Sequence, residues 1–550
     1  MIHLDGSTLE GGGQLVRNAV ALSALTSQPV KITRIRAKRD GSRGLRPSHT
    51  AAIQCLLDIC GGTAVNATVG SSEIIFYPRG EAGHREDLRP GGNTDDKIDD
   101  LASPLKPMNL ESMTDAPPIQ PEYSIHLKTP GSVFLIFQAL YPYLLYAGAC
   151  ANARGAERGE DPPEDIIKLN VTGGTNVSFS PSYDYISQVL IPNFATLGLP
   201  RLDVELKHRG WNGGQTGIGT VCVLIRPLGI RKLEAASKAE TQPAVRDPEP
   251  VCNSASFSPI FPEINLHAFD RGFITQIDIT VLAPDTSLNE EHPVSRSKHG
   301  KRQRQRVKRG SLGRKEERNQ EDFYPEASDI DSDTSSGELD ENRSVPHSIR
   351  EWMENYALET VSHKFSSKGK SCCADAQPLK IGLRRSEATN HYSQTYILLV
   401  AHTSTGFRLG RDALFGAPNK SMQGKKSNHT PHQKSKGKGK SQAKSSLKMG
   451  VNMERVVTDM VDQCVEDLMY ELADGDDPRN IEKMLKNGQS KRFLDSYMRD
   501  QVVVFQALGK LGAADGGAKS IPRNPYEERD LSLHTQTAMW VCEQMLGTKF

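Results

Sequence analysis

The sequence predicts a mixed α/β (α+β) fold in which helices cover β-sheets. Over residues 1–228, short runs rich in β-branched and aliphatic residues alternate with glycine-containing turns, and each turn leads into an amphipathic or apolar helix. This order of strand, turn and helix is typical of layered folds with helices packed on sheets. This order of strand, turn and helix recurs several times, which indicates a core assembled from similar units.

The expected elements of this region follow one another along the chain. Strands are expected at MIHLDG (1–6), VKITRIRA (30–37), SIHLKTPGS (124–132), IIKLNVTGG (166–174), LDVELKHRG (202–210) and TVCVLIRPL (220–228). Helices are expected near 14–25, from 47 to the Gly61-Gly62 stop, from 132 to 149, and near 182–194. Apolar residues at helical spacing and glycine or proline punctuation support these boundaries.

The apolar stretch at residues 132–149 approaches the length of a membrane-spanning helix. It contains Gln138, Pro142 and three tyrosines, and its flanks show no asymmetry of charge. We therefore expect a buried core helix and no membrane association.

The character of the sequence changes after residue 228. Residues 285–345 and 416–448 are dominated by charged and small polar residues, so they offer too little apolar surface to order, and we expect both to be disordered. A further loop insertion is expected at 85–122. Helical spacing resumes at 453–473, and two more helices are expected at 493–508 and 535–546. We predict a core domain formed by residues 1–228 and 485–550, interrupted by a smaller inserted domain at 229–484.

Net charge, cysteine spacing and the start of the sequence each bear on the class of protein. The 68 basic and 67 acidic residues give a net charge of +1, so an anionic partner has to be met by local basic patches. The nine cysteines form no CxxC pair, which argues against a disulfide framework or a zinc site. The start of the sequence lacks the features of a signal peptide.

Two features are candidates for chemistry. Gly11-Gly12-Gly13 lies between an expected strand and helix, where free N–H groups favour an anion, and basic residues gather nearby at 34–49. His534 stands just ahead of an expected helix, where the dipole disfavours the imidazolium and keeps a nucleophilic nitrogen available. Taken singly, an unliganded glycine turn, a solvated basic edge and a capping histidine explain these features equally well.

Several motifs occur together in one order along the chain. They are EGGGQLVR (10–17), IRAKR with GLRPSH (35–49), TPGSVFLIFQ (129–138), GGTN with SPSYDY (173–185), HTSTG (402–406), YMRDQVVVFQALG (497–509) and LHTQTA (533–538). In this combination the chain resembles the RNA 3′-terminal phosphate cyclases. The match covers roughly half of the chain, which makes it far more specific than any single motif.

The resemblance implies a fold and an activity. It implies a large domain of three βαβαββ units, similar to the fold of enolpyruvyl transferases, with a smaller α/β domain inserted before the last unit. It also implies that a histidine takes AMP from ATP and passes it to an RNA 3′-phosphate, which the neighbouring 2′-OH then closes into a 2′,3′-cyclic phosphate. The implied partners are ATP and RNA with a 3′-phosphate end.

The resemblance also implies roles for individual residues. The position of the family's nucleophile is His534, and Glu10 matches a glutamate near the metal of the bound nucleotide, Mg²⁺ or Mn²⁺. The positions that resemble ATP-binding residues are Gln138, Pro181, Tyr497, Asp500 and Gln501. Those expected to hold phosphates are Arg17, Arg36, Arg39 and His49.

The sequence also departs from the family pattern. The family's RG-xx-P-x-GGG signature appears here as RGWNGGQTGIGTV (209–221), without the proline, and the loop after the second strand is one residue longer. Family members also continue into terminal strands after the last helix, whereas this sequence stops at Phe550.

Three functions compete for this chain. A catalytic cyclase is favoured over a non-catalytic, cyclase-like scaffold for ribosome assembly, because such scaffolds lack the histidine and the glycines that are present here. An enolpyruvyl transferase would share only the fold, and fold alone does not define function. The basic run at 301–309 suggests nuclear localisation, and a solvated linker is an equally fair interpretation.

Overall fold

The computed structural model describes twelve stretches of the chain. They are residues 1–39, 41, 43–78, 118–158, 166–212, 216–233, 256–288, 348–365, 379–417, 452–473, 492–511 and 531–550. The expected insertion at 85–122 and the expected disordered tracts at 285–345 and 416–448 lie almost entirely outside these residues, and the basic run at 301–309 lies wholly outside them.

The first sheet is built by the N-terminal residues, and its strands lie in the order β1-β2-β4-β3. Strands β1 and β2 are parallel, and the other two pairings are antiparallel. The elements follow the sequence β1 (Ile2–Asp5), α1 (Gly13–Thr26), β2 (Val30–Thr33), α2 (Pro47–Cys60), β3 (Thr63–Val65) and β4 (Ile74–Tyr77). This arrangement is a βαβαββ unit.

The second sheet repeats the same connectivity. Its order is β5-β6-β8-β7, again with one parallel pair followed by two antiparallel pairs. The elements are β5 (Glu122–His126), α3 (Val133–Glu157), β6 (Ile167–Gly173), a helical segment made of α4 (Tyr183–Tyr185), a π-helix (Ile186–Leu190) and α5 (Ile191–Thr196), then β7 (Leu202–His208) and β8 (Gly219–Ile225). The mixed α+β class is thus confirmed, while the expected likeness to enolpyruvyl transferases stays a prediction.

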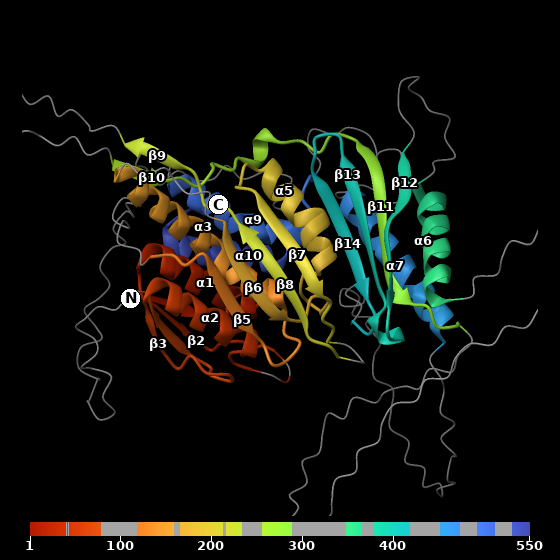
Figure 1. The fold of residues 1–550 in the computed structure, drawn as a ribbon, viewed down its shortest axis with the longest axis horizontal. Helices are drawn as coiled ribbons and strands as arrows, with labels where there is room; N and C mark the ends of the chain where they lie inside the picture. The colour runs from red at the N-terminus through yellow and green to blue at the C-terminus, as the bar shows by residue number, and fades with distance from the viewer. Residues whose placement is uncertain are drawn as a thin grey trace, which may run out of the picture.

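The third four-stranded sheet has a different order, β12-β11-β13-β14. It consists of β11 (Ile274–Pro284), β12 (Lys380–Thr389), β13 (Tyr396–Thr403) and β14 (Arg408–Leu414), with helices α6 (Ile349–Phe365) and α7 (Met453–Ala473). One face packs on α6 and α7 in a separate hydrophobic core, whereas Leu282, Leu398 and Val400 on the other face join the main core. Figure 1 shows this sheet beside the second unit, with the first sheet on the far side of that unit and α6 on the outer side of the third sheet.

The remaining elements pack on the main core. Helices α9 (Ser496–Leu511) and α10 (Leu533–Leu546) lie against each other, and α10 also packs on α1. A two-stranded sheet of β9 (Ile230–Leu233) and β10 (Ser256–Pro259) lies beside α3. The predicted domain boundaries at 228 and 485 stay predictions.

Helix α3 occupies the centre of the main core, as predicted for the apolar stretch at 132–149. Among the described residues it is the helix long and apolar enough to cross a membrane, and 89% of its most apolar window is buried inside the protein. Tyr141 stacks on Phe194 at 5.8 Å between ring centroids and meets Phe505 edge to face. These contacts account for its burial as a core helix.

Several expected boundaries shift; α3 continues past 149 to Glu157, and β5 ends at His126 and not at 132. Strand β2 ends at Thr33, before residue 37, because Arg34 and Arg36 adopt left-handed backbone conformations with φ of 50° and 56°. The expected helix at 493–508 runs three residues later. Helix α10 begins at Leu533, because the Ser532 side chain accepts a hydrogen bond from the Thr535 N–H and caps the helix. His534 therefore lies in the first turn of α10 and not ahead of it.

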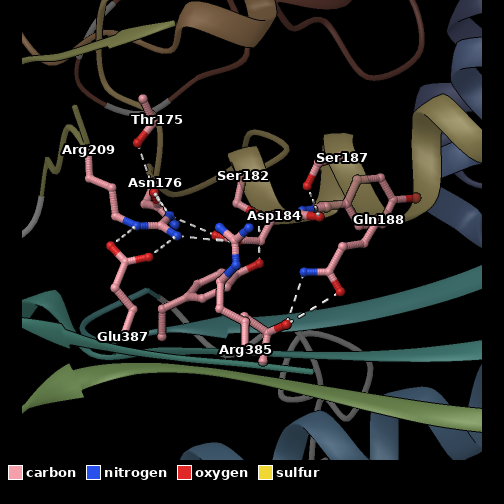
Figure 2. Close-up of polar contacts among 12 residues, drawn as sticks. Thr175, Asn176, Ser182, Asp184, Ser187, Gln188, Arg209, Arg385 and Glu387 are labelled. Atoms are coloured by element: carbon pink, nitrogen blue, oxygen red, sulfur yellow. Dashed lines mark hydrogen bonds and ion pairs between the residues drawn. The ribbon is translucent and has the colours of Figure 1, made fainter. Parts of the chain in front are cut away.

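A buried ion cluster joins the second sheet to the third (Figure 2). The Arg209 guanidinium lies 2.7 Å from Asp184 and 2.7 Å from Glu387, and Arg385 reaches Asp184 at 3.3 Å. Burial alone would lower the pKa of Arg209, but hydrogen bonds and charge from Glu387 and Asp184 outweigh it and raise that pKa above its ordinary value. Arg209, from the altered RG motif, thus clamps the two sheets together.

Replacing Asp184 with Ala should lower the free energy of unfolding by about 3–5 kcal/mol, because the buried Arg209 guanidinium would lose one of its two carboxylate partners. Arg385→Ala is the matched control, since Arg385 is 38% exposed and its loss should cost about 1 kcal/mol or less. Urea unfolding of both variants measures the difference. Equal stability of the two variants would contradict the assigned role of the buried pair.

Candidate functional site

The N-termini of four helices converge on one region of the core. A Cβ at Gly13, in the first turn of α1, would overlap the ring of His49 in α2. The Glu10 N–H donates to Thr537 Oγ1 of α10 at 3.3 Å. A Cβ at Gly131, just before α3, would lie 3.8 Å from Ser48 Cβ of α2. Helix N-termini carry partial positive charge and unpaired N–H groups, so their convergence favours an anionic ligand.

The glycine run lets these segments approach so closely. Gly11 has φ of 63°, which other residues rarely adopt. A Cβ at Gly12 would overlap the Glu10 carboxylate, and one at Gly13 would overlap His49 Nε2. Gly11 and Gly13 therefore require glycine for separate steric reasons, whereas a side chain at Gly12 would displace only the end of the Glu10 side chain.

His534 is held by a residue of the same glycine motif. Its Nδ1 lies 2.8 Å from Oε1 of Gln14, whose side chain is buried. An amide oxygen only accepts hydrogen bonds, so Nδ1 carries the proton and the lone pair of the neutral ring lies on Nε2. The His534 side chain is 50% exposed, which leaves the ring accessible to a ligand.

Gln14 also connects His534 to a pocket behind it. The pocket is lined by Gln14, Asn18, Phe137, Gln138, Tyr141, Pro142, Leu190, Phe194, Asp500, Gln501, Val504 and Phe505. Burial raises the pKa of Asp500 to about 6, although hydrogen bonds from Gln501 and Gln14 and the charge of Arg17 act to lower it. Three of the five predicted ATP-binding residues, Gln138, Asp500 and Gln501, thus line one pocket.

The other two predicted ATP-binding residues lie elsewhere. Tyr497 is on the same helix as Asp500 but packs its ring under the Arg411 guanidinium, 4.2 Å from the ring centroid. Pro181 follows Ser180 just before α4 and is not among the residues that line the pocket. The structure therefore groups three of these residues and sets two apart.

Three of the four predicted phosphate-holding residues, Arg17, Arg36 and His49, form a cationic cluster with Arg46. Burial lowers the pKa of His49 to about 3, with further lowering by the charges of Arg17, Arg36 and Arg46. Burial also lowers the pKa of Arg17 to about 10; Asp500 opposes this change, and Arg36 adds to it. Clustered positive charge of this kind is favourable when an anion binds among the groups.

His49 presents a hydrogen-bond donor to this cluster. The Arg46 N–H donates to His49 Nδ1 at 3.1 Å. The proton of the neutral ring is therefore on Nε2, the nitrogen next to Gly13. A neutral donor at the N-termini of α1 and α2 suits a phosphate oxygen.

Glu10 offers an oxygen ligand beside His534. Its Oε1 pairs with Arg39, whereas its buried Oε2 has no hydrogen-bond partner and lies 3.7 Å from His534 Nδ1. Carboxylate oxygens suit Mg²⁺ and Mn²⁺. No group of three or more His, Cys, Asp or Glu side chains that could hold a metal occurs among the described residues. Glu10 thus fits one ligand position, and a bound ion would take its other ligands from phosphate and water.

Sequence reasoning missed two residues of this site. Gln14 belongs to the EGGGQLVR motif, and its polar side chain at the start of an otherwise apolar helix was a usable signal. Arg46 stands in the basic run, three residues before His49, and contacts it locally as the N-cap of α2. Neither position is conspicuous from spacing alone.

The fold and the site define an α+β protein with a cationic cluster at converging helix N-termini, and with a histidine held by Gln14, which also lines a small pocket. The family model described as RNA 3′-terminal phosphate cyclase matches residues 8–550. The chain belongs to the RNA 3′-terminal phosphate cyclase family.

Curated relatives support this assignment. The chain is 35% identical over 210 residues to an RNA 3′-terminal phosphate cyclase of Desulfurococcus amylolyticus, covering 38% of this chain and 43% of the relative. It is 30% identical over 248 residues to that of Methanosarcina mazei and 32% identical over 240 residues to that of Pyrococcus furiosus, each covering 44% of this chain and 54% of the relative. The chain thus spans about half the length of these curated relatives.

The depressed pKa of His49 predicts a pH dependence of stability. Between the ordinary pKa of 6.5 and the folded value of about 3, the unfolded chain takes up a proton that the folded chain excludes. Stability contributed by this group is therefore present above pH 6.5 and is lost as the pH falls. Urea midpoints measured from pH 7 to pH 4 should fall less steeply for His49→Gln than for the wild type. Parallel profiles would rule out burial of a neutral His49.

Proposed function

We propose that this chain uses ATP to convert an RNA 3′-terminal phosphate into a 2′,3′-cyclic phosphate through a histidyl-AMP intermediate. The observation that carries the proposal is His534, whose Nδ1 is hydrogen-bonded to Gln14, a residue that also lines the pocket with Asp500. Membership of the cyclase family supports the same activity.

The proposed reaction has three displacements at phosphorus. His534 Nε2 attacks the α-phosphorus of ATP and expels pyrophosphate. An oxygen of the RNA 3′-phosphate then attacks the histidyl-AMP phosphorus, which frees the histidine and joins AMP to the RNA end. Finally, the ribose 2′-OH attacks the 3′-phosphorus and expels AMP. Each step exchanges one phosphoryl linkage for another, so positioning and charge neutralisation supply most of the catalysis.

Gln14 serves in this scheme as a positioning residue. By accepting from Nδ1, it fixes the tautomer in which Nε2 is nucleophilic, and it restricts rotation of the ring. Its second contact, with Asp500, ties that orientation to the nucleotide pocket.

Three polar residues that line the pocket beside Gln14, namely Gln138, Asp500 and Gln501, would contact the nucleotide. Tyr497 and Pro181 keep their assignment to ATP binding as proposals from family resemblance. Glu10 would hold Mg²⁺ or Mn²⁺, which supplies charge neutralisation at the triphosphate when bound.

The cationic cluster would hold the RNA 3′-phosphate. Arg17 and Arg36 supply charge, and His49 Nε2–H supplies a neutral donor at the N-terminus of α1. Arg39 pairs with Glu10, so we assign it to positioning that carboxylate as well as to phosphate binding. We further propose the three-unit, enolpyruvyl transferase-like fold and nuclear localisation, both as expected from the sequence.

Incubation with ATP labelled at the α-phosphate tests the first step. Wild type should form an acid-labile, base-stable protein adduct, and His534→Ala should form none, because the nucleophile is lost. Gln14→Ala should slow adduct formation by about a hundredfold, since a misplaced nucleophile costs roughly that much. Absence of adduct with the wild type would favour a non-catalytic scaffold.

The phosphate cluster can be tested separately from the first step. Arg36→Ala should still form the ATP-derived adduct but should raise the KM for 3′-phosphorylated RNA about tenfold or more, because one charge-assisted contact to phosphate is lost. The formation of phosphatase-resistant RNA ends measures this step. Equal loss of adduct formation would instead place Arg36 at the nucleotide. Lys31→Ala, on β2 away from the cluster, is the charge-matched control.

A further inference from the structure

Phe179 has an unusual conformation for an aromatic residue. Its backbone φ is 62°, in the left-handed region that bulky residues avoid, and its side chain is 69% exposed. The protein thus holds a large apolar ring in water at a strained position. Such strain persists only where the surrounding structure imposes it, and it is concentrated at functional sites.

The turn that carries Phe179 is fixed on both sides. Before it, Val177 is buried against Gly174, where any Cβ would overlap the valine. After it, Ser180 Oγ is hydrogen-bonded to Ser132 Oγ, the capping side chain of α3. Ser182 then caps α4 and bonds the Tyr396 hydroxyl at 2.6 Å. The exposed ring is therefore displayed by a well-anchored turn.

The turn is linked to the start of α2 through residues 131 and 132. Gly174 donates its N–H to Gly131 O at 2.7 Å, and a Cβ at Gly131 would lie 3.8 Å from Ser48 Cβ. Ser48 directly precedes His49 in the first turn of α2. Residues 131 and 132 therefore lie between the turn at 179 and the segment that carries His49.

We propose that Phe179 is a stacking platform for a nucleobase near the 3′ end of the RNA. This inference rests on the proposed function, because it takes the cluster around His49 as the site of the RNA phosphate. Recognition of single-stranded RNA depends on unstacked bases that lie on exposed aromatic rings, beside positive charge that holds the backbone. Phe179 and the cluster supply these two elements, with residues 131 and 132 between them.

The RNA is favoured over ATP as the source of the base. The pocket beside Gln14 is lined by α1, α3, the π-helix, α5 and α9, and Phe179 is not among its lining residues. Pro181, assigned to ATP binding by resemblance, is two residues away, so the binding test has to separate an RNA base from adenine. A ring that faces solvent suits a flexible strand that arrives from outside, whereas an adenine enclosed in a pocket would bury its contacts.

Direct binding tests the platform without any chemical step. Fluorescence anisotropy with a short 3′-phosphorylated oligoribonucleotide should give a Kd about tenfold or more higher for Phe179→Ala than for the wild type, and close to the wild-type value for Phe179→Trp. Abasic substitution of the terminal nucleotides in turn should weaken wild-type binding at one position, and Phe179→Ala should lose nothing further there.

Tyr470→Ala is the matched control. Tyr470 is 63% exposed on α7, which packs on the third sheet, so its loss should not affect RNA binding. Melting temperatures of all variants exclude unfolding as the cause. Unchanged RNA binding by Phe179→Ala would overturn the proposal. So would slower formation of the ATP-derived adduct with intact RNA affinity, which would place the ring at adenine. If the wild type forms no adduct, the proposed catalysis is wrong, but the RNA-binding measurement still tests the role of Phe179, because binding requires no chemical step.

Discussion

The close approach of backbone at Gly11–Gly13 is the constraint on which the candidate site depends. Without side chains at Gly12 and Gly13, the Glu10 carboxylate folds back over the loop and the His49 ring reaches the N-terminus of α1. Gln14, the next residue, then reaches His534. A methyl group at Gly13 would push the His49 ring away from the start of α1, since packed interiors leave little room to absorb it, and one at Gly12 would displace the Glu10 carboxylate.

A second segment, residues 180–185, connects the site to the third sheet. Ser180 bonds the start of α3, Asp184 joins the buried cluster with Arg209, and the Tyr185 hydroxyl donates to Asp495 at 2.7 Å. Asp495 in turn accepts from two N–H groups at the start of α9, which carries Asp500 and Gln501. The third sheet is thus coupled to the pocket by buried polar contacts, and these are costly to leave unsatisfied.

Much of the fold was predictable because its signals are local. The cadence of strand, glycine turn and helix located the first two units, and the tyrosines and Pro142 identified α3 as a core helix. The predicted end of β2 was wrong because Arg34 and Arg36 adopt left-handed backbone conformations, which end the strand before residue 37. The π-helix at 186–190 likewise has no sequence signal that distinguishes it from an α-helix.

The sequence alone determined the fold class and the family, together with the residue types available for chemistry: a histidine, a glycine run and a basic stretch. Which side chains meet was decided only by the tertiary structure. Gln14 and His534 are 520 positions apart, and Arg209 and Glu387 are 178 apart, so no local periodicity could pair them. Tertiary packing also set the charge states, because burial and three neighbouring arginines keep His49 neutral. Contacts and desolvation depend on the whole chain, whereas propensity and motif depend on a few residues at a time.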